Sequence, residues 1–424
     1  MSYTNFWILK DALNKIEEYS AVLTEYGKSV SLDNLKSEID NTLEKVKSFV
    51  ENENSPDEPD DYESIIKLCK GGNTVVKNIP DLKEKIAGAL LGRFVGCTLG
   101  VPVEMWSIEN MKKLAKYNNM PFPPIDYWTT VDRPYDIQYS TDERIKYTRD
   151  NIDGVPVDDD VTYTILGLLI IEKYGFNFTT EDVGNLWKEI LPIACTAEDI
   201  ALKNLKKGIP ANKAGSIDNP YRLWIGADIR ADGFAYCAAG NPTLAAAMGY
   251  RDAYLSHRRG GIYGEMFFAA AEAAAFVCKN PIEAIYAGIR EIPTTSKLYK
   301  DIEWALNMMP SIKNYEQARE AVDNYFNGMS PVHTNNNACL TIFGLKLGNG
   351  DFTDTIGNTV AMGLDNDCTG ATAGSIIGAI VGEKGISSHW TKNFNNKVRT
   401  YLIGHKELSI DDLINRFVIQ AKKL

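Results

Sequence analysis

The sequence has few of the residues that build thiolate metal sites, disulfide frameworks and histidine-based catalysis. Its seven cysteines form no CxxC pair, and only four histidines occur in 424 residues. An odd number of scattered cysteines leaves at least one thiol unpaired, which argues against a disulfide scaffold and against a thiolate zinc site. We therefore expect a reducing environment and predict a cytoplasmic protein.

Clustered positive charge and long apolar runs are also lacking. The chain has 45 Lys and Arg against 56 Asp and Glu, which gives a net charge of -11. Binding to nucleic acid or to an anionic membrane needs clustered Lys and Arg, so neither partner is expected. No uninterrupted apolar run of about 20 residues is present. The first residues lack the basic region and apolar stretch of a secretory signal.

Three common catalytic fingerprints are missing. The sequence contains no G-x-S-x-G elbow, no Walker loop and no G-x-G-x-x-G motif, so a serine hydrolase, a P-loop NTPase and a Rossmann enzyme lack support. The 44% hydrophobic content is still sufficient for a large buried core. Any active site must therefore come from other residues.

Helical periodicity dominates the chain. Residues 1–50 have the apolar spacing of two amphipathic helices. Strand-like alternation is scarce, which predicts an all-α fold. Further helices are expected at 160–174, 181–192, 242–255, 264–278, 281–289 and 315–326.

Two segments interrupt the helical pattern. Residues 51–63 contain seven acidic groups, two prolines and no basic residue, a composition that resists packing. They are interpreted as a flexible linker or a solvated surface loop. Residues 117–157 are dense in Pro, Tyr and Asp and predict a long irregular loop, which in compact domains is often a functional lid.

Two stretches contain glycine at every fourth position, which aligns the glycines on one helix face. Each glycine costs about 1 kcal/mol relative to alanine, so such a ridge usually marks a backbone that must approach closely. We predict that the two helices cross tightly at the centre of one domain. The glycines are Gly88, Gly92, Gly96 and Gly100 in the first stretch and Gly370, Gly374, Gly378 and Gly382 in the second.

Two acidic clusters each lead into an apolar helical pattern. They are Asp158-Asp159-Asp160 and, about 200 residues later, Asp365-x-Asp367. One aspartate at a helix N-terminus is commonly a cap, but three in succession repel one another beyond what capping needs. Carboxylates without histidine or a thiolate set favour hard cations such as Mg²⁺, Mn²⁺ or Ca²⁺. A calcium loop starting at Asp365 is disfavoured, because its twelfth position is Ile376 instead of Glu.

His257 has the most suggestive setting of the four histidines. It precedes Arg258, Arg259 and the Gly260-Gly261 pair, which lead into a helix. Backbone amides at that helix N-terminus are a potential phosphate site. A surface turn with an ordinary histidine is the alternative interpretation.

Four stretches taken together resemble the ADP-ribosylglycohydrolase family, which includes the dinitrogenase reductase-activating glycohydrolase. They lie at 85–104, 156–164, 224–265 and 333–379. The resemblance implies a compact multi-helix all-α catalytic domain, which we place at residues 81–424, with residues 1–80 as a helical extension. It also implies two divalent cations, Mg²⁺ or Mn²⁺, in a central cleft. The reaction implied is hydrolysis of the glycosidic bond between ADP-ribose and an acceptor, either a protein side chain or a small molecule.

In that family a Thr-Asp-Asp triplet and an Asp-x-Asp-[Ser/Thr] motif supply the metal ligands. Asp158 here replaces the usual hydroxyl residue, and Cys368 replaces the usual Ser or Thr. Because a thiol is a poor ligand for Mg²⁺, Thr369 or a water is an alternative to Cys368 at the second ion. By position, the ligands correspond to Asp158, Asp159, Asp160, Asp365, Asp367 and Cys368.

The resemblance also implies roles in catalysis. Glu104 matches the acidic residue that closes the family's first glycine-rich motif, which is linked to catalysis or to gating of the metal cleft. His257 falls where some relatives contact ADP-ribose. The implied mechanism has the cations hold the 2″ and 3″ hydroxyls and orient a water at C1″, with either Asp367 or Glu104 as the base.

Three other interpretations stay open at this stage. The substrate bond could be another N- or O-ribosyl linkage, because the scaffold fixes ribose and not the leaving group. The protein could be a non-catalytic ADP-ribose-binding module, since Asp158 and Cys368 depart from the family pattern. In a purely structural helical protein, the five aspartates would be surface caps.

Overall fold

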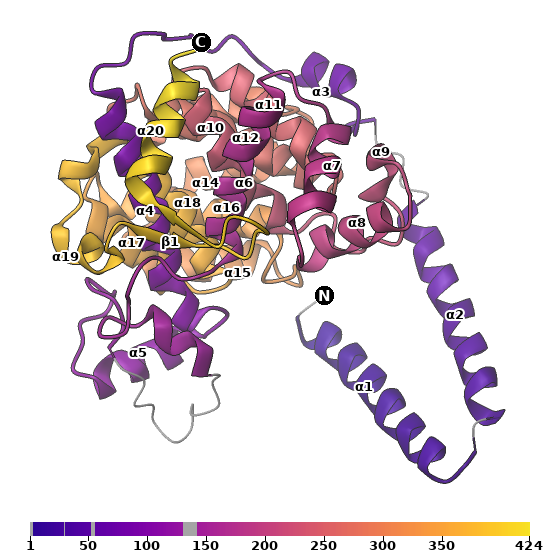
Figure 1. Ribbon diagram of the computed structural model, residues 1–424. Coiled ribbons are helices and arrows are strands. Elements are labelled where there is room, and N and C mark those ends of the chain that lie inside the picture. The colour runs from indigo at the N-terminus through magenta and orange to yellow at the C-terminus, as the bar shows by residue number, and fades with distance from the viewer. Residues whose placement is uncertain (1–2, 29, 52–55, 130–141) are drawn as a thin grey trace.

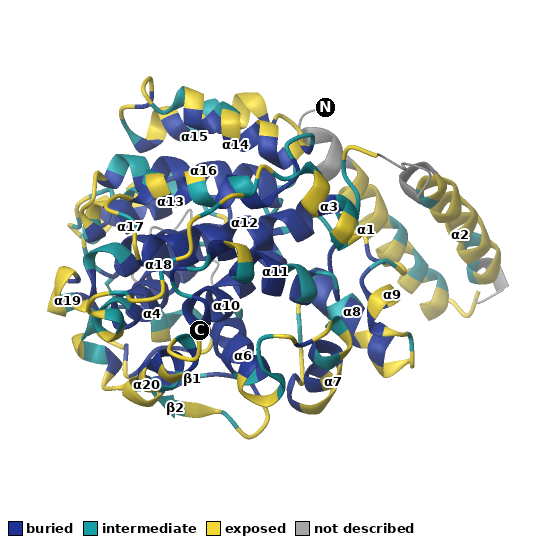
Figure 2. Cartoon of the chain, turned by 90° about the horizontal axis from the view of Figure 1, so that it is seen from above, coloured by how far each residue is buried: buried dark blue, intermediate teal, exposed yellow. Residues whose placement is uncertain are grey.

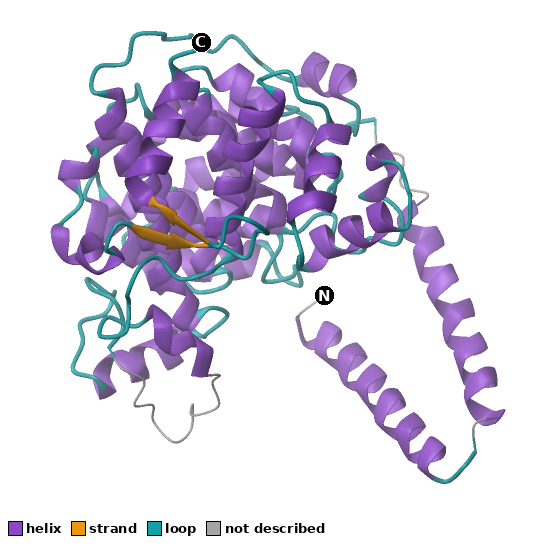
Figure 3. Cartoon of the chain, viewed as in Figure 1, coloured by secondary structure: helices purple, strands orange, loops and turns teal. Residues whose placement is uncertain are grey.

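The computed structural model describes residues 3–28, 30–51, 56–129 and 142–424. Helices make up almost all of the regular structure, and in the described ranges the only sheet is a two-stranded antiparallel one (Figures 1 and 3). The all-α prediction is confirmed. The α-helices are α1 (Tyr3–Glu25), α2 (Val30–Glu51), α3 (Tyr62–Leu68), α4 (Leu82–Gly100), α5 (Ile108–Tyr117), α6 (Asp159–Tyr174), α7 (Thr180–Ile190), α8 (Thr196–Lys206), α9 (Ala211–Ala214), α10 (Ala231–Cys237), α11 (Pro242–Ala253), α12 (Gly260–Ala275), α13 (Pro281–Gly288), α14 (Lys297–Met308), α15 (Tyr315–Tyr325), α16 (Thr334–Gly348), α17 (Phe352–Ala361), α18 (Asn366–Val381), α19 (Ser388–Thr391) and α20 (Ile410–Ala421).

Short elements connect and close these helices. Strand β1 (Lys397–Arg399) pairs with β2 (Glu407–Ser409), and Val398 lies opposite Leu408. The 3₁₀ helices are η1 (Val101–Val103), η3 (Asp142–Tyr147), η4 (Ile225–Arg230), η5 (Ile289–Glu291), η6 (Glu383–Gly385) and η7 (Lys392–Phe394).

Helices α4 and α18 cross along their glycine ridges, as the spacing predicts. A Cβ added at Gly92 would lie 2.1 Å from the carbonyl oxygen of Gly374, and one added at Gly96 would lie 2.0 Å from that of Gly370. Gly88 meets Gly378 in the same way, so the two helices run antiparallel with their backbones in contact. Any side chain on these faces would separate the helices.

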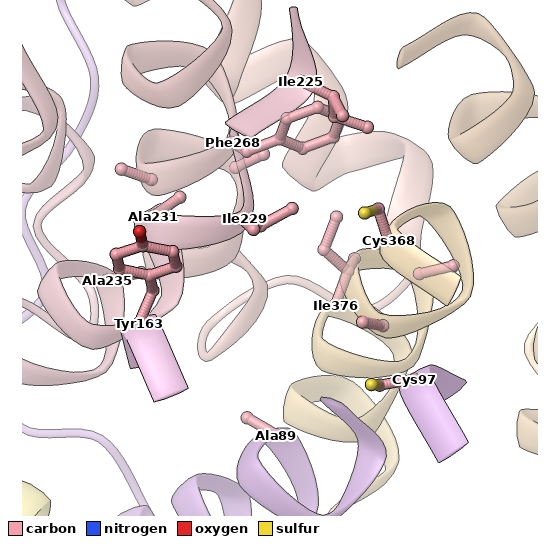
Figure 4. Close-up of a cluster of buried hydrophobic side chains, with 14 of the residues drawn as sticks. Ala89, Cys97, Tyr163, Ile225, Ile229, Ala231, Ala235, Phe268, Cys368 and Ile376 are labelled. Carbon is pink, nitrogen blue, oxygen red and sulfur yellow. The ribbon is translucent and has the colours of Figure 1, made fainter. Parts of the chain in front are cut away.

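The apolar character of α4 reflects a central position in the protein. The stretch Leu82–Val103 is long and apolar enough for a membrane span by length and composition, although Arg93 interrupts it, and the whole window is buried inside the protein. Helix α12 is buried along its entire length (Figure 2). Around these helices apolar side chains from α4, α6, η4, α12 and α18 pack into one core (Figure 4).

The N-terminal helices α1 and α2 form a hairpin that extends away from the main body (Figure 1). Their described side chains are mostly exposed, and Leu13 and Val46 are examples. The two predicted amphipathic helices are therefore present. The division of the chain at residue 80 stays a prediction.

The acidic segment at 51–63 is docked on the main body from Asp57 onward, whereas residues 52–55 lie outside the described part. The hydroxyl of Thr295 donates to the carbonyl of Asp57, and the backbone N–H of Lys297 donates to Glu58, both at 2.7 Å. The hydroxyl of Tyr263 donates to the carbonyl of Pro59 at 2.5 Å. The expectation that this composition resists packing is wrong here, because fixed donors satisfy its carbonyls and carboxylates.

The predicted irregular loop at 117–157 is anchored on both sides of residues 130–141, which lie outside the described part. Before that gap, the indole N–H of Trp128 donates to the carbonyl of Leu99 at 3.0 Å, and the hydroxyl of Tyr127 donates to that of Trp390 at 2.8 Å. After the gap comes η3. Arg144 of η3 pairs with Glu104, which follows α4. Both flanks of the loop therefore contact the C-terminal end of α4, and the chain then continues to the first acidic cluster.

Candidate metal centre

The first acidic cluster begins helix α6, as predicted. Asp158 is the N-cap residue, and its carboxylate accepts the backbone N–H of Asp160 at 3.0 Å. Asp159 and Asp160 lie in the first turn, and Asp160 is fully buried. Capping therefore uses one carboxylate and leaves the other two for a different purpose.

The second cluster begins helix α18 by a sharp reversal of the chain. Gly363 and Leu364 both have positive φ, at 71° and 62°, which turns the end of α17 into the start of α18. The backbone N–H of Asp365 lies 3.4 Å from the amide oxygen of Asn337. Gly100 completes the fit, because a Cβ there would lie 2.3 Å from the Cα of Asp367. The last glycine of the first ridge therefore lets Asp367 lie against the end of α4.

The two clusters meet at this crossing of α4, α6 and α18. Asp160 and Asp367 each belong to groups of three side chains whose potential ligand atoms lie within 4.8 Å of one another. Asp159 is in none of the groups found among the described residues. The groups are Cys97, Asp158 and Asp160; Asp160, Asp367 and Cys368; and Glu104, Asp365 and Asp367.

Glu104 follows the short η1 helix at the C-terminal end of α4 and faces the second cluster. Its carboxylate forms an ion pair with Arg144 of η3 at 3.1 Å, and about a third of each side chain is exposed. The negative charge of Asp367 together with burial raises the pKa of Glu104 to about 8, and Arg144 opposes that shift. In the group of Glu104, Asp365 and Asp367, Glu104 is therefore the residue nearest to solvent.

The carboxylates are held where their charges are poorly compensated. Burial raises the pKa of Asp367 to about 7, with a further contribution from the charge of Asp160, and Oδ1 of Asp367 is buried without a hydrogen-bond partner. Burial likewise raises the pKa of Asp160 to about 7 and the pKa of both Asp158 and Asp365 well above the usual range. Buried carboxylates in this number are stable when a cation lies among them. The oxygen-rich set fits a hard divalent cation.

Arg93 is a buried partner of the acidic centre that the sequence analysis did not identify. Its fully buried guanidinium forms ion pairs with Asp160 at 2.7 Å and with Asp232 at 2.8 Å. The sequence does contain an indication of this role, since Arg93 is a single arginine in an otherwise apolar, glycine-rich helix. A buried arginine needs acidic partners. Of the five carboxylates in the three groups, Asp160 has an ion pair with Arg93 and Glu104 has one with Arg144, and no further ion pair to the five occurs in the described part of the chain.

Cys368 takes part in the centre as a protonated thiol. Its sulfur lies 3.2 Å from Oδ2 of Asp160. Burial, followed by the charge of Asp160, raises the pKa of this thiol well above its ordinary value. The hydroxyl of Thr369 is also buried and has no hydrogen-bond partner. Cys368 and Thr369, the two residues considered as ligands in place of the family's Ser or Thr, are therefore both buried at the start of α18.

His257 lies in a different environment, fully buried and outside the acidic groups. Its Nδ1 shares a hydrogen bond with the hydroxyl of Ser256 at 2.8 Å, and burial lowers its pKa well below the usual range. At the nearby N-terminus of α12, the backbone N–H of Arg259 already donates to the carboxylate of Asp60 at 2.7 Å. This donor of the predicted phosphate site is thus taken by the chain itself, and contact between His257 and ADP-ribose stays a prediction.

One comparison with known proteins identifies a family for this chain. The family model described as ADP-ribosylglycohydrolase matches residues 78–422. A search of curated proteins finds no match. One similar solved structure is described as an ADP-ribosylglycohydrolase-related protein complex; it has 16% sequence identity and a TM-score of 0.48, and the match covers 81% of this chain and 98% of that chain.

Proposed function

The chain belongs to the ADP-ribosylglycohydrolase family, and from this premise we propose that it is a metal-dependent hydrolase of the glycosidic bond between ADP-ribose and an acceptor. The acceptor is a protein side chain or a small molecule. The family supports glycosidic-bond hydrolysis in general, and the metal requirement and the ADP-ribosyl substrate are our proposals for this chain.

The observation that carries the proposal is the meeting of two acidic motifs about 200 residues apart. Asp160 of α6 and Asp367 of α18 share one group of potential ligands within 4.8 Å. A stable fold without function would not bring together buried like charges, since each costs several kcal/mol unless neutralised. The unpartnered Oδ1 of Asp367 supports a missing cationic partner at that point.

The residues present fit two adjacent divalent cations. Asp160, Asp367 and Cys368 would hold one, and Asp365, Asp367 and Glu104 would hold the other, with Asp367 shared. Asp158 belongs to the neighbouring group with Cys97 and Asp160. Carboxylate oxygens favour Mg²⁺ or Mn²⁺ over softer ions. Once bound, such cations supply the positive charge that keeps these carboxylates ionised and polarises oxygen ligands.

The protein's own groups account for proton transfer. Hydrolysis requires a water to lose a proton as it adds to C1″ and the acceptor to gain one as it leaves. We assign the proton-accepting role to Glu104, because its side chain adjoins both Asp367 and solvent. The proton that Glu104 takes from the water would then pass to the leaving acceptor, so that the step is balanced. Arg144 would then position Glu104 through their ion pair, which leaves Asp367 to bind and orient.

A second candidate function has one observation in its favour. The Cys368 thiol is engaged with Asp160 at the position where the resemblance implies a hydroxyl ligand. A weakened second ion site would favour a non-catalytic ADP-ribose-binding module. Cleavage of another N- or O-ribosyl bond remains the alternative within enzymes.

The test is release of ADP-ribose from three substrates: an arginine-linked ADP-ribosyl protein, a serine-linked one and a small-molecule conjugate. Each is assayed with Mg²⁺, with Mn²⁺ and with a chelator. Release that depends on metal supports the hydrolase and identifies its linkage. Tight ADP-ribose binding without release from any substrate would instead support the binding module.

A further inference from the structure

A pocket of about 510 Å³ is lined by residues that directly precede the first acidic cluster in the chain, together with Arg399. It lies between η3, the loop before α6 and strand β1. This volume is within the roughly 300–1,000 Å³ of small-molecule sites. Its lining includes Lys146, Tyr147, Asn151, Asp153, Val157 and Arg399.

The pocket and the metal centre share a wall. Tyr147 lines the pocket, and its hydroxyl donates to the carbonyl of Val157. Val157 is 40% exposed and directly precedes Asp158, the N-cap of α6. Burial and then the charge of Asp158 raise the pKa of the Tyr147 hydroxyl, so this wall of the pocket lies close to the first acidic cluster.

The pocket lining contains one cation without an ion-pair partner among the described residues, Lys146, in an otherwise acidic protein. Arg399 is partly compensated by Glu407 at 3.1 Å and by Asp153 at 4.0 Å. Lys146 is exposed and has no ion-pair partner among the residues that the structure describes. Asp153 accepts a hydrogen bond from Asn395 at 2.8 Å. Arg399 is therefore paired with two carboxylates, and Lys146 is the lining cation whose charge is uncompensated among the described residues.

We propose that this pocket binds an anionic group of the substrate, either a carboxylate or a phosphate, and that Lys146 determines this specificity. The inference rests on the proposed hydrolase function. Two sources of the anion share this chemistry: the acceptor and the pyrophosphate of ADP-ribose. The carboxylates of the acidic centre repel an anion that lies within about 8 Å of them, and the positive charge of Lys146 would offset this repulsion.

The experiment compares KM values of the full chain and two charge-reversal variants, Lys146→Glu and Lys188→Glu. Lys188 is an exposed residue of α7 away from the pocket lining, and it gives the same change in net charge. Two of the substrates are small-molecule ADP-ribose conjugates that have the same linkage. The acceptor of one conjugate is neutral, and the acceptor of the other has a carboxylate. A ribosyl conjugate without the pyrophosphate completes the set.

We expect Lys146→Glu to raise KM about threefold to tenfold for the substrates that have the recognised anion, with kcat little changed and the effect reduced at high salt. A rise confined to the carboxylate acceptor identifies the acceptor as the source. A rise for both ADP-ribose conjugates, absent for the conjugate without pyrophosphate, identifies ADP-ribose as the source.

Equal KM values for Lys146→Glu and Lys188→Glu on every substrate would overturn the inference while leaving the hydrolase function intact. A wild-type protein that cleaves none of the conjugates with Mg²⁺ or Mn²⁺ would overturn the proposed function and the inference together.

Discussion

The sulfur of Cys368 lies 3.2 Å from Oδ2 of Asp160, although the two residues are 208 positions apart in the chain. The pKa of the thiol is raised well above its usual range, chiefly by burial, so it donates its proton to the carboxylate. One carboxylate oxygen of the centre is thus engaged by a soft donor that binds Mg²⁺ poorly. The unusual residue therefore bears directly on metal preference.

Replacing Cys368 with serine should raise the affinity for Mg²⁺ several-fold and change the affinity for Mn²⁺ less, because a hydroxyl oxygen is a harder ligand of similar size. Titration calorimetry with each ion measures the change. Cys339→Ser is the matched control, since Cys339 is also buried but its sulfur contacts the carbonyl of Asp301. Unchanged Mg²⁺ affinity in Cys368→Ser would show that this position is not a ligand.

Asp367→Asn should stabilise the metal-free protein and abolish metal binding. The carboxylate is buried with an unpartnered oxygen and a pKa raised to about 7, so a permanently neutral amide removes an unfavourable charge above that pH. The expected gain in unfolding free energy at pH 8 with chelator is about 1–3 kcal/mol. Added Mn²⁺ should stabilise only the wild type. A less stable variant in chelator would contradict this account of the charge.

Gly96→Ala should destabilise the fold by more than about 3 kcal/mol, because the new Cβ would lie 2.0 Å from the backbone oxygen of Gly370. Urea unfolding measures the loss. Gly260→Ala provides the comparison, since its Cβ would meet Asn335 at an ordinary 3.6 Å. Similar small effects in both variants would mean that the helix crossing tolerates separation.

His333→Asn should reduce the acid sensitivity of the fold. Nδ1 of His333 accepts the N–H of Asn335 at 3.1 Å as the N-cap of α16, and burial lowers the pKa of His333 to about 4. In the unfolded chain His333 binds a proton below about pH 6.5, whereas in the folded chain it does so only below about pH 4. The free energy of unfolding therefore falls by about 3 kcal/mol as the pH is lowered across this range.

Asparagine can cap the helix equally well and does not titrate. Unfolding free energies of His333→Asn and wild type at pH 7 and pH 4.5 give the comparison. The wild type should lose more stability between these two values than the variant does. Parallel pH dependence would assign the acid sensitivity to other groups.

Periodic features were predictable from the sequence because their spacing encodes geometry. The four-residue glycine spacing anticipated the tight crossing of α4 and α18 but not its antiparallel direction, and the apolar periodicity gave α6, α7, α11, α13 and α15 to within a few residues. Helix α12 begins four residues before its predicted start, since Gly260 and Gly261 suggested a turn. The helices outside the predicted ranges are α3, α5, α8, α9, α10, α14, α16, α17, α19 and α20.

Contacts between distant segments were not predictable in the same way. Arg93 pairs with Asp232, 139 residues away, and no local pattern marks Asp232 as its partner. Arg144 faces Glu104 only because η3 adjoins the end of α4. The carboxylate of Asp60 accepts the backbone N–H of Arg259 and its carbonyl accepts the hydroxyl of Tyr250, whereas its acidic surroundings indicated a solvated segment. The carboxylate motifs themselves could be identified, but the counter-charges around them required the fold.

The most direct test of the central claim is the number of Mn²⁺ ions bound per chain, measured by electron paramagnetic resonance of the free ion during titration. The account predicts two sites in the wild type and loss of both in Asp367→Asn, because that carboxylate is shared between the two ligand groups. Absence of Mn²⁺ binding by a folded wild-type chain would contradict it.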